Sequence, residues 1–501
     1  MRIIVIWCFL FTFLAAQDTI RSSVFKNQSN RTPVINVVRP SDVTYQLWEG
    51  FTLVRNANSG DAAAAHELGL RYLTGQGFTP DSAKAFQLVE YAAEHGHILA
   101  HFNLGVFYHN GWGTEWNPYE AYKNFKYAAE HNIKEGEYAY GLNFTDNLTV
   151  ARNWKEAYKW IKKSAGDGYA PAKEILPELE RYASAQGTDS SVTLTGTTNQ
   201  SQSSTLQPLL LDFAIEKEDT TQAKVKAIDI LRALGPKWQK RIQELPVVTD
   251  SILFSLLIRH AEWGVPEEFN VLARFYEQGI GTKQDSIAAV LAYLRAVRLE
   301  SRRAPSLLIR MIENASLINK IQQRASRGDA EAMYIVSGFS LTEIYSMQKK
   351  EDIISYLQKA SQLHNLPSIV ELGTAYFNGQ LVPQQKEKSE QLWMNAYKMG
   401  SNEALIRIAS AKILSGFGSL SVDSAFHVLL KGDEEESLLA QVTLGICYER
   451  GIVVQQKKSE AVRYYRLASQ RGSRIAYSSL KRMYDSIRPA DKEFQISDLQ
   501  D

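Results

Sequence analysis

Cysteine is nearly absent from this chain of 501 residues, which contains only Cys8 and Cys447. Cys8 lies in an apolar first segment that we expect to be removed, which would leave Cys447 alone. A disulfide framework and a structural zinc site built from cysteines are therefore excluded. Cys447 occupies a position where related segments of the chain carry phenylalanine, so we interpret it as a core residue.

An excess of charge of one sign is also missing, because 56 lysine and arginine residues face 55 aspartate and glutamate residues. The two signs are interspersed along the chain. This balance provides no electrostatic reason to expect binding to nucleic acid or to an anionic membrane surface. We therefore expect neither partner.

Long apolar runs are confined to the start of the chain, which reads MRIIVIWCFLFTFLAA. The positive Arg2, the apolar residues 3–14 and two small alanines predict a cleaved signal peptide at residues 1–16, with an uncleaved membrane anchor as the alternative. The run is shorter than the about 20 residues that a membrane-spanning helix needs. We therefore expect a protein of the secretory pathway, whether secreted, periplasmic or in the lumen of the endoplasmic reticulum, with no membrane span after signal removal.

Catalytic and cofactor motifs are missing as well, since the chain has no Gly-x-Ser-x-Gly, P-loop or dinucleotide-binding pattern. His97 and His101 are four residues apart, a spacing that can place two zinc ligands on one helix face. No third ligand and no His-Glu-x-x-His motif accompany them. We interpret both histidines as structural and expect no enzyme, no catalytic residue, no metal and no cofactor.

A period of 36 residues runs through the chain. A large apolar residue or tyrosine, here called the marker, recurs at Leu68, Leu104, Tyr140, Leu272, Val336, Leu372, Ile408, Leu444 and Leu480. The position after the marker is small in eight copies: Gly69, Gly105, Gly141, Ala273, Ser337, Gly373, Ala409 and Gly445. A small side chain at one fixed position lets two helices approach closely.

Each period predicts two helices joined by a turn. Paired glycines such as Gly75 and Gly77 would end the first helix, and a polar cap would begin the second. The cap candidates are Asp81, Asn117, Asp285 and Asp423. Because one such unit cannot bury its apolar face alone, neighbouring units must stack. The sequence therefore predicts an all-α fold, an α-solenoid of helix–turn–helix units of about 36 residues.

This pattern resembles the Sel-1-like repeat family, which is related to the tetratricopeptide repeats. The resemblance is carried by Ala64, Leu68-Gly69, Tyr72, Gly75, Gly77, Asp81, Lys84-Ala85, Tyr91-Ala92-Ala93 and Gly96, and by their counterparts in the later units. It implies a non-enzymatic scaffold or adaptor that binds other proteins on the concave surface of the solenoid. Two alternatives stay open: a lumenal adaptor in endoplasmic-reticulum-associated degradation, and an enzyme like the cysteine-rich β-lactam-hydrolysing members, which the lack of cysteines disfavours.

Composition divides the chain after the signal peptide into a disordered N-terminal segment (17–40), an N-terminal repeat array (41–183), a linker (184–207), a C-terminal repeat array (208–488) and a tail (489–501). The linker is rich in serine and threonine and has few large apolar residues, so it cannot form a core. We therefore predict two arrays joined by a flexible connection.

The expected partner-binding site lies on the first helix of each N-terminal unit, at positions that point away from the packed face. The candidates are His66, Leu70, Phe102, Val106, Tyr138 and Leu142, with Trp112 and Trp116 from an aromatic turn and Asn103 as a polar contact. Asn103 is included because an amide can hold a peptide backbone with both a donor and an acceptor. Alternatively, this stripe packs on the adjacent repeat. Candidate N-glycosylation sites are Asn27, Asn30, Asn147 and Asn199.

Overall fold

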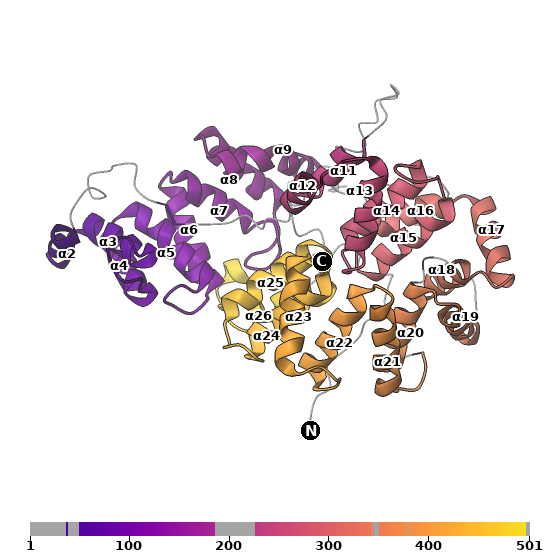
Figure 1. Cartoon of the computed structure of the whole chain (residues 1–501). Coiled ribbons are helices and arrows are strands. Elements are labelled where there is room, and N and C mark those ends of the chain that lie inside the picture. Colours follow the sequence, from indigo (N-terminus) through magenta and orange to yellow (C-terminus); the bar gives the residue numbers. More distant parts are fainter. Residues whose placement is uncertain are drawn as a thin grey trace.

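The helices of this chain form a repeat solenoid, as the period predicts (Figure 1). The computed structural model describes residues 37–38, 50–185, 226–342, 344, 350–379 and 381–496. Within these ranges every regular element is helical. The expected signal peptide, most of the expected disordered segment and the linker from residue 186 onward lie outside the described residues.

The N-terminal array contains α2 (Gly50–Asn58), α3 (Ala62–Thr74), α4 (Ser82–Glu94), α5 (Ile98–Asn110), α6 (Pro118–Glu130), α7 (Lys134–Leu142), α8 (Trp154–Gly166) and α9 (Ala170–Ala185). The C-terminal array begins with α11 (Ala227–Ala233), α12 (Pro236–Gln243), α13 (Asp250–Ala261), α14 (Pro266–Gln278), α15 (Ser286–Arg298), α16 (Ala304–Ile312), α17 (Ala315–Ser326), α18 (Ala330–Leu341) and α19 (Lys350–Gln362). It ends with α20 (Leu366–Asn378), α21 (Lys386–Lys398), α22 (Asn402–Ser415), α23 (Val422–Glu434), α24 (Leu438–Arg450), α25 (Lys458–Gln470), α26 (Arg474–Asp485) and the 3-10 helix η1 (Lys492–Phe494). None of the helices in the described part of the chain combines the length and the apolar character that crossing a lipid bilayer requires.

Local signals begin and end these helices largely where the sequence predicts. The side chains of Asp81 and Asn117 cap α4 and α6 by accepting hydrogen bonds from main-chain N–H groups of the first turn. Gly75 ends α3 with φ 75°, a left-handed conformation that glycine adopts without steric cost. One predicted cap is wrong: Asp423 lies inside the first turn of α23, because the N-cap is Ser421.

The position after the marker brings the two helices of a unit into close contact. A Cβ atom added to Gly105 of α5 would lie 2.6 Å from Cε1 of Phe125 on α6. The equivalent Gly445 of α24 faces Tyr465 of α25, again with 2.6 Å between the added Cβ and Cε1 of the ring. The predicted close approach is therefore confirmed in units from both arrays.

The end of the C-terminal array packs against the N-terminal array, although most of the chain separates them (Figure 1). Tyr119 Oη on α6 donates a hydrogen bond of 3.2 Å to the main-chain oxygen of Tyr484 on α26. Arg488 Nη2 donates to the main-chain oxygen of Leu148 at 2.8 Å. Phe494 is fully buried, with its ring centroid 5.0 Å from that of Tyr119. The stretch predicted as the start of a tail is thus anchored to the N-terminal array through the buried Phe494.

Candidate functional site

Asn103 on α5 holds the main chain of a segment that comes from the N-terminal side of the same chain. Its Oδ1 accepts a hydrogen bond from Val38 N, and its Nδ2 donates one to Val38 O, both at 2.7 Å. One side-chain amide thereby satisfies both main-chain groups of a single residue. We call the surface of α3 and α5 that contacts Val37 and Val38 the Asn103 face.

His66 of α3 orients the amide of Asn103. Asn103 Nδ2 lies 2.7 Å from His66 Nε2, and because an amide NH₂ can only donate, this ring nitrogen is the acceptor. Burial, and secondarily the neighbouring His97, lower the pKa of His66 to about 3. The ring centroids of the two histidines are 4.5 Å apart. His66 is therefore neutral near pH 7 and keeps Nε2 free to accept.

Apolar side chains complete the Asn103 face. Val37 packs against two core clusters, one that contains Leu104 and one that contains Phe102. Val38 packs against the second of these clusters. Both valines are only partly buried. The face thus combines one polar group for the main chain with apolar surface for the side chains, which suits an extended apolar peptide.

The structure buries most of the predicted partner-binding residues. Those that are buried are His66, Leu70, Phe102, Asn103, Val106, Trp116, Tyr138 and Leu142, whereas Trp112 is partly exposed. His66 and Asn103 come together at Val38, as described above. The others do not form one exposed surface with them, which favours the alternative interpretation that much of this stripe packs on neighbouring helices.

Tyr138 and Trp116 are the clearest departures from the expected exposure. The ring centroid of Tyr138 lies 5.2 Å from that of Tyr169, just before α9. The ring of Trp116 lies 5.1 Å from Tyr484 of α26. Later helices cover both rings, so neither is available as an anchor in this conformation. Trp112 makes a local contact, with its ring 6.1 Å from that of Phe107.

The candidate glycosylation sites separate into one that the structure describes and three that it does not. Asn147 is only 2% exposed, has φ 55°, and accepts a hydrogen bond of 3.1 Å from Arg152 N. In the folded chain this amide is therefore inaccessible to a glycosyltransferase, and its prediction as a surface site is corrected. Asn27, Asn30 and Asn199 lie outside the described residues and stay predictions.

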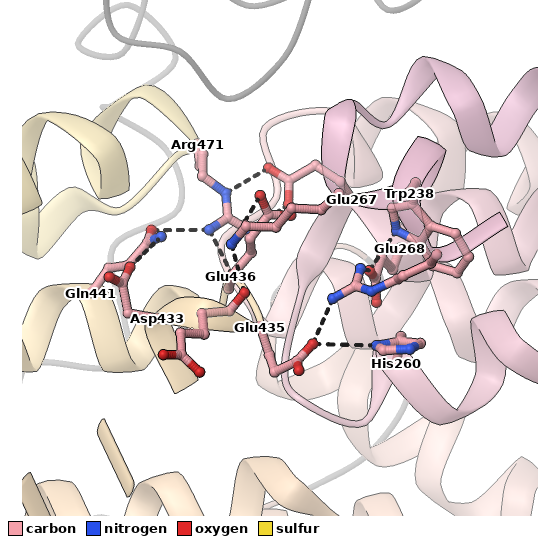
Figure 2. Close-up of polar contacts among 12 residues, drawn as sticks. Trp238, His260, Glu267, Glu268, Asp433, Glu435, Glu436, Gln441 and Arg471 are labelled. Carbon is pink, nitrogen blue, oxygen red and sulfur yellow. Dashed lines mark hydrogen bonds and ion pairs between the residues drawn. The ribbon is translucent and has the colours of Figure 1, made fainter. Parts of the chain in front are cut away.

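A cluster of charged residues joins the start of the C-terminal array to its end (Figure 2). Arg471, after α25, pairs with Glu267 of α14 at 2.6 Å, and Arg241 of α12 pairs with Glu435, after α23, at 2.5 Å. The partners are 204 and 194 positions apart in the sequence. The sequence does not reveal this cluster, because contacts over such distances leave no periodic signal. Its ion pairs hold the two ends of the array together.

Glu268 is the most perturbed carboxyl group of this cluster (Figure 2). Burial raises its pKa to about 8, against the opposing effects of a hydrogen bond from Trp238 Nε1 at 2.8 Å and of Arg241. A carboxyl group with a shifted pKa can mark an active site. Here, however, Trp238 and Arg241 lie on α12, which packs against α14, so the shift of the Glu268 pKa has a structural cause. Among the described residues, no group of three or more histidine, cysteine, aspartate or glutamate side chains is arranged to hold a metal ion.

Helix pairs at a 36-residue spacing, closed by small residues at one position, define an α-solenoid of the helix–turn–helix repeat class. A model of the Sel1 repeat matches residues 62–97, 98–133, 270–299, 367–401 and 438–473. The chain therefore contains five Sel1 repeats, as the resemblance implied. The pairs α7–α8, α18–α19 and α22–α23 keep the marker spacing outside the matched ranges.

Two solved structures are similar to this chain. A protective antigen present in uropathogenic Escherichia coli strains, displaying an SLR fold, is 20% identical over 90% of this chain and 92% of its own, with a TM-score of 0.31. A Sel1 repeat protein from Oxalobacter formigenes is 19% identical over 90% of this chain and 97% of its own, with a TM-score of 0.23. Sel1 repeats generally act in protein–protein interaction, and their solenoid is typically a non-enzymatic scaffold.

Proposed function

We propose that this chain is a non-enzymatic adaptor in an extracytoplasmic compartment and that it binds an extended polypeptide on the Asn103 face of its N-terminal array. The observation that carries this proposal is the pair of 2.7 Å hydrogen bonds between the amide of Asn103 and the main chain of Val38. Main-chain groups are common to every polypeptide, so a side chain that binds them in this way suits a peptide-binding surface. The apolar surroundings supply the remaining contact area.

The proposed compartment follows from the apolar first 16 residues and their resemblance to a signal peptide. A lumenal adaptor in endoplasmic-reticulum-associated degradation is a narrower form of the same proposal. Mass spectrometry of the exported protein should find Gln17 as the first residue. A full-length N-terminus on the exported protein would contradict signal cleavage.

An enzyme of the β-lactam-hydrolysing kind is the competing proposal. The described residues hold one free cysteine, Cys447, which is buried in the core of the C-terminal array. We expect no hydrolysis of a chromogenic β-lactam above that of a heat-denatured sample. Turnover that saturates with substrate would favour the enzyme.

Peptide selection followed by matched substitutions tests the binding surface. Clones from a displayed random-peptide library would be enriched on the full chain carrying Val37→Asp and Val38→Asp, which keeps the chain's own segment from occupying the face, and then measured against two further substitutions in that chain. Asn103→Leu leaves the main chain of a bound peptide without its partners, so affinity should fall about 5- to 100-fold. Asn110 lies on the same helix but donates only within it, to Val106 O at 3.0 Å. Asn110→Leu should therefore bind as the parent does, and equal binding by Asn103→Leu would contradict the proposal.

A further inference from the structure

The Asn103 face is already occupied by the chain itself. Val38 precedes Asn103 by 65 positions and reaches it from outside the repeat array. Its two hydrogen bonds to Asn103 both use main-chain atoms, and its side chain adds apolar contact with the neighbouring core cluster. A different polypeptide segment in the same conformation could present the same groups.

The chemistry of the occupant indicates which segments fit. Valine is β-branched, and such residues favour the extended backbone in which N–H and C=O of one residue point to the same side. Of the two adjacent valines, Val37 contacts both clusters and Val38 contacts the one that contains Phe102. A segment with two adjacent β-branched apolar residues would reproduce these contacts.

Among three neighbouring units of the array, one carries a side chain that can hold a peptide main chain at this position. The positions equivalent to Asn103 in the flanking units, one period away, are Glu67 and Ala139. Glu67 forms an ion pair with Arg71 at 3.1 Å, and Ala139 has no polar side-chain atom. Asn103 is thus the single member of the three that can both donate to and accept from a peptide main chain. The face therefore holds a short segment and does not track a long one.

We propose that Val37–Val38 is a resident ligand of the Asn103 face, and that the partner is an extended polypeptide segment with two adjacent β-branched apolar residues that binds by displacing it. This inference rests on the proposed function and names the partner chemistry and the competitor of the same surface. A tethered ligand competes at an effective concentration of order millimolar, so release of the segment controls the affinity for the partner.

A synthetic peptide of residues 34–42, VINVVRPSD, labelled with a fluorophore, is the probe. In the full chain, the double substitution Val37→Asp/Val38→Asp places carboxylates on apolar surface and should free the face. This variant should bind the probe at least about tenfold more tightly than the parent chain. Adding Asn103→Leu, or methylating the probe at the nitrogen of Val38, should reduce that binding about 5- to 100-fold.

Hydrogen exchange of the parent chain supplies a readout that does not depend on the double variant. The amide of Val38 donates to Asn103 Oδ1, so it should be protected in the parent and exchange freely in Asn103→Leu, while the Asn110→Leu control keeps the protection. Protection that survives Asn103→Leu would overturn the inference.

The outcomes separate the inference from the proposed function. If the parent and the double variant bind the probe equally, the segment does not compete and the inference is overturned. The proposed function still stands in that case as long as library peptides bind through Asn103. A parent dimer that the double substitution converts to a monomer would show that a second copy donates the segment, which also overturns it. Loss of Asn103-dependent binding by all peptides would overturn both.

Discussion

Replacing Gly105 by alanine should destabilise the protein, although alanine is the better helix former. The added Cβ would lie 2.6 Å and 2.7 Å from Cε1 and Cδ1 of Phe125, and 3.2 Å from the carbonyl oxygen of Ala121. The ring is only 1% exposed, and the carbonyl belongs to α6, so neither can move aside freely. Overpacking should cost about 1–3 kcal/mol, while the gain in helix propensity is about 1 kcal/mol. We expect a net loss of up to about 2 kcal/mol in the free energy of unfolding.

Gly166 at the end of α8 provides the matched control. It is helical too, but nothing lies within 4 Å of an added Cβ, so Gly166→Ala should stabilise the protein by about 0.5 kcal/mol. Both variants would be compared by guanidinium unfolding followed by circular dichroism. A second substitution, Phe125→Leu, should be less harmful in the Gly105→Ala background than alone, because it removes the clashing ring atoms. If Gly105→Ala raised stability as Gly166→Ala does, the close helix contact would be refuted.

Three further predictions concern contacts between distant parts of the chain. Glu268 has a folded-state pKa of about 8, above its ordinary value of 4.5, so the folded state keeps a proton that the unfolded state releases in this window. The free energy of unfolding should therefore fall as pH rises from 4.5 to 8, by up to about 1.4 kcal/mol per pH unit, and Glu268→Gln should flatten this slope in denaturant titrations. Phe494→Ala should raise hydrogen exchange at residues 488–496 with little change in the melting temperature, because losing the buried ring frees a terminal segment; a large drop in melting temperature would contradict a local role. Limited proteolysis should cut first within residues 184–207, and the two halves should still co-elute because Arg488 joins them; separation of the halves would count against that contact.

The repeat unit was predictable because its signals are local. A marker, a small residue after it, turn glycines and a polar cap all act within about 36 residues, and each was found where expected except the cap at Asp423. Ser421 is the N-cap instead, because a serine side chain, like that of aspartate, can accept hydrogen bonds from the first turn. Residue types alone do not distinguish between two cap candidates that lie two positions apart.

The exposure of the candidate site was much less predictable. The rule of 100° per residue correctly separates the packed face of one helix from the opposite face, but it carries no information on what later covers that face. Tyr138 lies at a position of α7 expected to face outward and is nevertheless buried against Tyr169, and Trp116, from the turn before α6, is buried against Tyr484. Asn103 could be singled out because its chemistry suits a peptide main chain. The segment that occupies the Asn103 face could not be predicted from the sequence, because Val37 and Val38 belong to no repeat.

The contact between the two arrays determines which surface remains accessible to a partner. The aromatic side of α6 is covered by the end of the chain, through the buried Phe494 and the contacts of Tyr484 with Tyr119. On the Asn103 face the occupant is held instead by two hydrogen bonds of a kind that any extended segment can form. Exchanging one segment for another keeps both hydrogen bonds, so their net contribution to the exchange is small. The preference between the resident segment and a partner should therefore depend on the apolar side chains that flank the held residue, and on how readily the tethered segment leaves.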